Sequence, residues 1–149
     1  MPLTLVDLVN KKVDECYAKA RKFFNMPELL RCEVEFGLTG LRAGTANYTR
    51  NRIRINSGFL LRECVDMIED TVPHEVAHLV TYRVFSTFRV RFGYNALTNQ
   101  FPKLKPHGSE WRLVMEMVLG VPATRCHKYA IVREAGRYQA GNPHSRRKP

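Results

Sequence analysis

The chain has few cysteines, no long hydrophobic run and few acidic residues in its second half. Its 149 residues include four cysteines without a CxxC pair, which argues against a cysteine zinc module and against a disulfide framework. No segment approaches the ~18 apolar residues of a membrane span, and the first residues do not follow the pattern of a secretory signal. We therefore expect an intracellular protein, in the cytoplasm or with the nucleoid or nucleus, that is not secreted and contacts no membrane.

The scarcity of acidic residues begins after residue 82. Residues 1–82 hold 11 Lys and Arg against 11 Asp and Glu, whereas residues 83–149 hold 13 against 3. The formal net charge of +10 therefore lies in the second part of the chain. Such a positive surface attracts polyanions, so nucleic acid is the first expected partner. A solubilising surface with a disordered basic tail is the alternative.

Secondary-structure patterns run along most of the chain and predict one α+β domain. Apolar residues recur with helical spacing in three segments, residues 4–25, 60–85 and 107–119. In three further segments apolar and polar residues alternate, as they do in half-buried strands: residues 32–36, 43–48 and 52–56. The second and third of these are predicted to form a hairpin. Pro73 lies inside a helical segment, so a kink or a new helix is expected there. Thr4 or Asp7, Thr71 and Ser109 are the expected helix N-caps.

Two segments lack the pattern of a packed core. Residues 83–106 are predicted to be a long insertion in a domain that covers residues 1–132, and residues 133–149 a basic, disordered tail. The insertion mixes arginines with aromatic residues, which can stack on bases or form a small apolar satellite cluster. DNA contacts are predicted for the basic residues Arg89, Arg91, Lys103, Lys105, Arg133, Arg137, Arg146, Arg147 and Lys148.

The segment VPHEVAH places two histidines four residues apart, with a glutamate directly after the first. Residues at this spacing lie on one face of a helix, with Cβ atoms about 5–6 Å apart. The imidazoles of His74 and His78 can therefore converge on one zinc ion, at Zn–N distances of about 2.0–2.1 Å. Glu75 would lie beside the metal, where it can take a proton from zinc-bound water and later pass it to a leaving amine. Two satisfied surface histidines on an ordinary helix are the alternative.

A catalytic zinc ion usually has three protein ligands and one open position. His107 is the favoured third ligand because it directly precedes a predicted helix, where Gly108 allows a tight turn. His127 can equally be a core or phosphate-facing histidine, and His144 lies in the predicted tail.

These motifs together resemble the SprT-like metallopeptidase family, which includes the Spartan proteases. That family combines HExxH on a helix with a third histidine in an HGxxW or HGxxF segment, here PHGSEW. The resemblance covers roughly residues 30–130 and implies a zincin-like fold, in which the HExxH helix packs on a small β-sheet. It also implies a zinc peptidase, often stimulated by DNA, that acts on proteins crosslinked to DNA. Two departures are the lack of cysteines for a zinc ribbon and the 28 residues between His78 and His107.

Analogy with zincins also suggests how substrate binds. The strand that holds Ile53, Arg54 and Ile55 would be the last in the sheet, and its exposed edge would pair with an extended substrate chain. Asp70 and Tyr82 each lie four residues from a predicted ligand. Asp70 can orient a ligand imidazole and Tyr82 can donate to a developing oxyanion, although most such residues are only solvated helix positions.

The sequence therefore predicts a zinc-dependent endopeptidase with one catalytic Zn²⁺. Its expected substrates are proteins associated with or crosslinked to DNA, and its expected DNA partner is single-stranded or irregular. The main alternative is a DNA-associated adaptor protein whose zinc is structural. A metallohydrolase of nucleic acid is disfavoured, because such enzymes commonly use carboxylate-rich two-metal sites. No oligomeric state is predicted.

Overall fold

A computed structural model describes residues 3–88 and 104–124 of the chain. The N-cap of the first helix, α1 (Leu5–Phe24), is Thr4, one of the two predicted candidates, and Thr4 forms a capping box with Asp7. The hydroxyl of Thr4 accepts a hydrogen bond from the Asp7 N–H, and the Asp7 carboxylate accepts one from the Thr4 N–H, both at 3.1 Å. These bonds satisfy two donors that a helix start otherwise leaves open. One face of α1 is buried in the core.

Three strands form one small sheet, β1 (Glu33–Leu38), β2 (Gly44–Asn47) and β3 (Arg52–Asn56). Their spatial order is β1-β3-β2. The predicted hairpin is confirmed, since β2 and β3 pair antiparallel. In addition, β1 pairs with β3 in parallel.

The order of the strands corrects the prediction for residues 53–55. Because β1 takes the far side of β3, the strand that holds Ile53, Arg54 and Ile55 is central and not an exposed edge. Ile53 and Ile55 are fully buried in the core. The Arg54 side chain pairs with Glu35 on β1, with the Arg54 Nε 3.1 Å from the Glu35 carboxylate. Within the described residues, β1 and β2 are the edges of the sheet.

The second half of the described chain is helical. After β3 follow α2 (Ser57–Arg62), α3 (Cys64–Asp66), a π-helical turn η1 (Met67–Thr71) and α4 (Val72–Phe88). The Val72 N–H donates to the Met67 carbonyl, so a wide turn precedes Pro73. Pro73 then lies in the first turn of α4, where its missing N–H costs nothing. A kink or a new helix was expected at Pro73, and the structure has the π-helical turn η1 directly before α4. Thr71 belongs to η1 and is not a cap.

Two predicted boundaries differ from the structure. The helix α4 continues to Phe88, so the first residues of the predicted insertion are helical. The last helical stretch consists of α5 (Ser109–Leu113) and the π-helical segment η2 (Val114–Leu119). Its N-cap is Gly108 and not Ser109, and no side chain makes a capping bond there.

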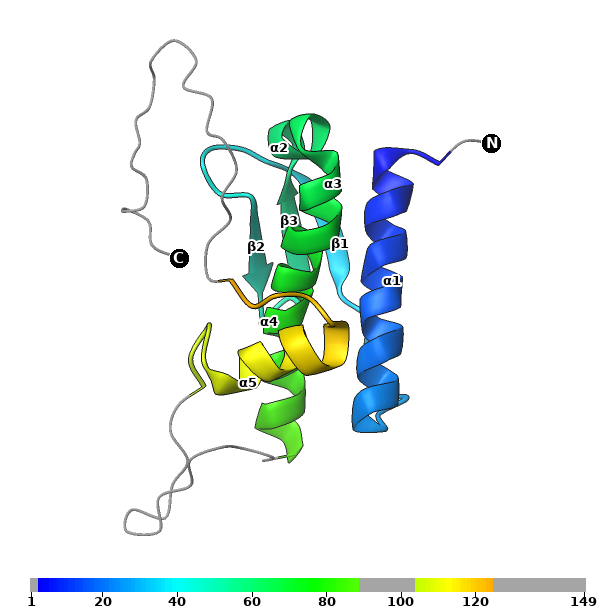
Figure 1. Ribbon diagram of the computed structural model, residues 1–149, viewed down its shortest axis with the longest axis vertical. Coiled ribbons are helices and arrows are strands. Elements are labelled where there is room, and N and C mark those ends of the chain that lie inside the picture. The colour runs from blue at the N-terminus through cyan, green and yellow to red at the C-terminus, as the bar shows by residue number, and fades with distance from the viewer. Residues whose placement is uncertain (1–2, 89–103, 125–149) are drawn as a thin grey trace.

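Helix α4 lies at the centre of the molecule (Figure 1). It contacts α1 on one side, β2 and β3 on another, and α5 and η2 on a third. Its fully buried residues include Val72, Val76, Ala77 and Val80. This α+β arrangement, with the HExxH helix packed on a small sheet, is the predicted zincin-like fold. In the described part of the chain, no helix has the length and apolar character needed to cross a membrane.

Candidate active site

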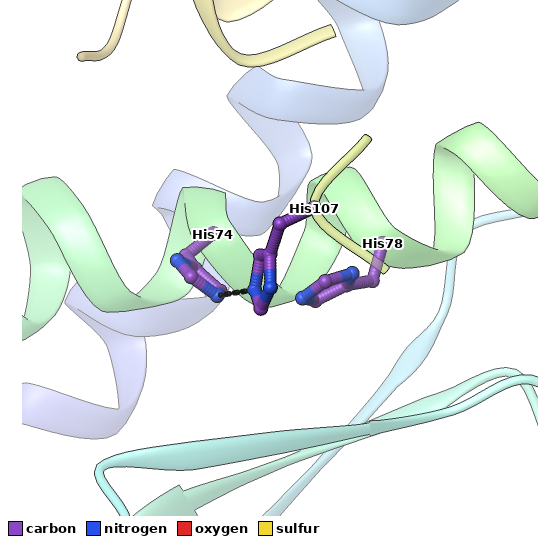
Figure 2. Close-up of side chains that lie close together, drawn as sticks. All are labelled: His74, His78 and His107. Carbon is purple, nitrogen blue, oxygen red and sulfur yellow. Dashed lines mark hydrogen bonds between the residues drawn. The ribbon is translucent and has the colours of Figure 1, made fainter. Parts of the chain in front are cut away.

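Three histidines from two separate segments converge on one point. His74 and His78 project from α4, and His107 approaches from the segment that precedes α5 (Figure 2). The His74 Nε2 and His107 Nε2 atoms are 3.2 Å apart. One ring nitrogen from each of the three histidines lies within 4.8 Å of the others. The centroids of the three rings are 4.9 to 5.1 Å apart.

This geometry fits a metal ion. A tetrahedral centre with metal–nitrogen bonds of about 2.0–2.1 Å holds its ligand atoms about 3.3–3.4 Å apart, close to the 3.2 Å between His74 and His107. Among the described residues, no second group of His, Cys, Asp or Glu side chains is gathered in this way. The structure thus brings His107 to the HExxH pair, as the sequence predicts. His127 and His144 lie outside the described residues.

Trp111 lies against all three imidazoles. It is fully buried. The distance from its ring centroid to the imidazole centroid is 4.9 Å for His74, 5.5 Å for His78 and 4.7 Å for His107. The indole Nε1–H also donates to the His74 backbone carbonyl at 3.4 Å. Trp111 lies in the helical segment predicted for residues 107–119, and the structure places it in the core. Its contact with the three histidines is a finding of the structure, because only the crossing of α5 over α4 brings the indole there.

Glu75 is a buried carboxyl group on the same helix. Only 5% of the residue is exposed. Burial raises the pKa of Glu75 to about 8, while the positive charge of Arg42 acts in the opposite direction. A carboxyl group with a pKa near neutrality can both accept and donate a proton under physiological conditions.

Strand β2 packs directly on Glu75 through Gly44. A Cβ atom added at Gly44 would lie 3.0 Å from the Glu75 Cγ, 3.1 Å from the Arg54 carbonyl oxygen and 3.2 Å from the Thr71 Cγ2. Gly44 was not among the site residues predicted from the sequence. A glycine inside a strand pattern is a signal for close backbone approach, and it could have pointed to position 44.

Two tyrosines meet beside this site. Tyr48 directly follows β2, and Tyr82 lies on α4 one helical turn after His78. Their ring centroids are 4.9 Å apart and their planes are inclined by 30°. Burial, and then the negative charge of Glu75, raise the pKa of Tyr48. The oxyanion role of Tyr82 stays a prediction, as does the orienting role of Asp70, which is half-buried in η1.

The predicted DNA-binding residues are almost all outside the described part of the chain. Of that set only Lys105 is described, and it is exposed two residues before His107. The remaining eight fall within residues 89–103 and 125–149.

Comparison with known proteins identifies the family. The model of the SprT-like family matches residues 13–127. The chain belongs to the SprT-like family. It is 35% identical to Protein SprT of Pseudomonas aeruginosa strain LESB58 over 127 residues, which is 85% of this chain and 67% of that protein. It is 36% identical to Protein SprT of Pseudomonas paraeruginosa strain DSM 24068 / PA7 over 131 residues, which is 87% of this chain and 70% of that protein.

A third relative is Protein SprT of Pseudomonas putida strain GB-1, with 35% identity over 129 residues, 87% of this chain and 69% of that protein. No solved structure matches the chain. The matched region of the SprT-like family contains His74, Glu75, His78 and His107. Family membership and the three-histidine group together support a role of the metallopeptidase type.

Proposed function

We propose that this SprT-like protein is a zinc-dependent endopeptidase that cleaves DNA-associated or DNA-crosslinked proteins. The observation that carries the proposal is the buried carboxyl of Glu75 next to three convergent imidazoles. A purely structural metal site has no need of a proton acceptor beside it. A zinc ion held by the three histidines would supply Lewis-acid chemistry and polarise the carbonyl of a scissile peptide bond.

The residues of the chain supply the proton transfers. Glu75 takes a proton from the attacking water and holds it on its carboxyl group. It then gives this proton to the leaving amine nitrogen as the peptide bond breaks. Burial, which raises the pKa of Glu75 to about 8, stabilises the protonated form between these two transfers. Trp111 keeps the His74 and His78 rings facing the same point, because it packs on both rings.

The outer edge of β2 is the proposed binding site for the substrate backbone. Within the described sheet β2 has one paired side, against β3, and its other side forms the edge. The strand begins at Gly44, against Glu75, and continues beside α4. An extended peptide that adds to this edge would pass the proton acceptor. This edge replaces the strand of residues 52–56, which the sheet order rules out.

Recruitment to DNA is proposed for the basic second part of the chain. Residues 83–149 hold 13 Lys and Arg against 3 Asp and Glu, which supports attraction to phosphates. Such attraction would raise the local concentration of proteins bound to the same DNA, without any sequence preference.

The test is proteolysis of a basic DNA-binding protein by the zinc-loaded chain, with and without single-stranded DNA. Glu75→Gln keeps the shape of the side chain and removes its proton chemistry, so cleavage should fall by at least about 100-fold. Glu116→Gln, at an exposed position where the carboxylate pairs with Arg112, is the matched control and should cleave normally.

The outcomes separate the alternatives. Cleavage that requires both DNA and Glu75 supports the full proposal, and cleavage without DNA supports the peptidase but not the recruitment. Equal and negligible cleavage by wild type and Glu75→Gln, each with one bound zinc, would favour an adaptor protein with a structural metal.

A further inference from the structure

The tyrosine pair formed by Tyr48 and Tyr82 joins the two elements that border the candidate active site. Tyr48 follows the last residue of β2, and Tyr82 belongs to α4. Their rings pack at a centroid distance of 4.9 Å, yet 38% of Tyr48 and 43% of Tyr82 remain exposed. In such a pair each ring packs on the other with part of its surface, and the remaining ring surface is free to contact a side chain of another molecule.

The position of the pair relative to Glu75 follows from two contacts. Gly44, at the start of β2, lies against Glu75, whereas Tyr48, after the end of β2, lies against Tyr82. Four strand residues span about 13 Å and seven helical residues about 10 Å. Over this distance β2 and α4 therefore run side by side in the same direction (Figure 1). A peptide along the outer edge of β2 would pass Glu75 and then reach the tyrosines within about four residues.

The charges around the pair indicate which side chain fits. The neighbouring charged residues in sequence are Arg50, two residues after Tyr48, and Arg83, directly after Tyr82. The two charged residues that follow the tyrosines in sequence are both positive, which disfavours a lysine or arginine of the substrate beside them. An aromatic or large aliphatic side chain gains contact area on the rings without this cost.

We propose that Tyr48 and Tyr82 form a specificity subsite that binds an aromatic or large aliphatic side chain of the substrate, within four residues of the scissile bond. The inference rests on the proposed peptidase function and names a substrate preference for it. The rings supply the contact, so their hydroxyl groups are not required for the preference.

The test uses the full zinc-loaded chain and a set of peptides that differ only in the residues flanking the scissile bond. Peptides with Phe, Tyr, Leu or Met at one fixed position should have kcat/KM values about 2- to 10-fold above those with Ala at that position. Tyr48→Ala and Tyr82→Ala should each bring this ratio close to one, whatever their effect on the cleavage of the Ala peptides. Tyr82→Phe should keep the ratio.

Control variants separate the subsite from general damage. Leu61→Ala and Met117→Ala remove exposed apolar side chains elsewhere, at 73% and 68% exposure, and should keep the ratio. Because both tyrosines are exposed, their alanine variants should bind one zinc and unfold within a few degrees of wild type.

A second readout does not depend on catalysis. Binding of a Phe peptide and an Ala peptide is measured on Glu75→Gln, with and without Tyr82→Ala. Tighter binding of the Phe peptide that is lost with Tyr82→Ala supports the subsite even if no peptide is cleaved, in which case only the peptidase proposal fails. Equal kcat/KM and equal affinity for the Phe and Ala peptides would overturn the subsite, and so would a preference for Lys or Arg at that position. In either case, cleavage that depends on Glu75 would still support the peptidase.

Discussion

Gly44→Ala tests the contact between β2 and Glu75 most directly. The new Cβ atom would lie 3.0 to 3.2 Å from atoms of three different elements, namely Glu75 on α4, Arg54 on β3 and Thr71 on η1. Carbon contacts are most favourable at about 3.5–4.0 Å, so one of these neighbours or β2 itself has to move by roughly 0.5 Å. The Arg54 atom is a backbone oxygen of the central strand and Thr71 is fully buried. The Glu75 side chain is therefore the neighbour that moves most easily.

The expected cost of this variant has two parts. Overpacking of a filled site costs about 1–3 kcal/mol in the free energy of unfolding. For a chain of this size that lowers the Tm by roughly 3–10 °C. A misplacement of about 1 Å costs on the order of 100-fold in rate, so a displacement of roughly half that should lower kcat by about 10-fold.

The matched control is Gly58→Ala in α2. A Cβ atom there would meet nothing closer than the Asn56 Oδ1 at 3.4 Å, an ordinary contact. Alanine is favoured over glycine inside a helix by about 1 kcal/mol, so this variant should unfold at the wild-type Tm or above. Thermal unfolding and peptide cleavage of both zinc-loaded variants are the measurements. If Gly44→Ala is as stable and as active as Gly58→Ala, β2 does not press on Glu75, and the reasoning about this contact is wrong.

Four further predictions concern the metal centre, the helix start and the cysteines. Chelation of zinc should lower the Tm of the wild type but not of His107→Ala, because only a folded three-histidine site gains stability from the ion. Trp111→Phe loses the bond to the His74 carbonyl, and zinc titration should show about 10-fold weaker binding; wild-type affinity would exclude a positioning role. Thr4→Ala removes one half of the capping box and should cost about 1 kcal/mol in chemical denaturation, with unchanged zinc binding. Burial raises the pKa of Cys16 to about 12, so alkylation at pH 8 followed by peptide mapping should modify the more accessible Cys64 first; equal rates would contradict the burial of Cys16.

The sequence by itself determined the features that depend on neighbours along the chain. Helical spacing and the N-cap candidates Thr4 and Asp7 located α1, because both signals arise from residues close together along the chain. The same spacing placed His74 and His78 on one face of α4. His107 was predicted from its place before a helix and from family resemblance. The tertiary fold brings its Nε2 atom to 3.2 Å from the His74 Nε2 atom.

Only the tertiary structure decided the features that depend on distant segments. The pairing of β1 with β3 moved residues 53–55 from a predicted edge to the centre of the sheet. The alternation of apolar and polar residues along a strand indicates which face of the strand is buried, but it does not indicate which strand lies next to it. Likewise, the contacts of Gly44 with Glu75, of Trp111 with the three imidazoles and of Tyr48 with Tyr82 each join separate elements. Their geometry is set by how the sheet and α5 pack on α4, and no local pattern in the chain encodes that packing.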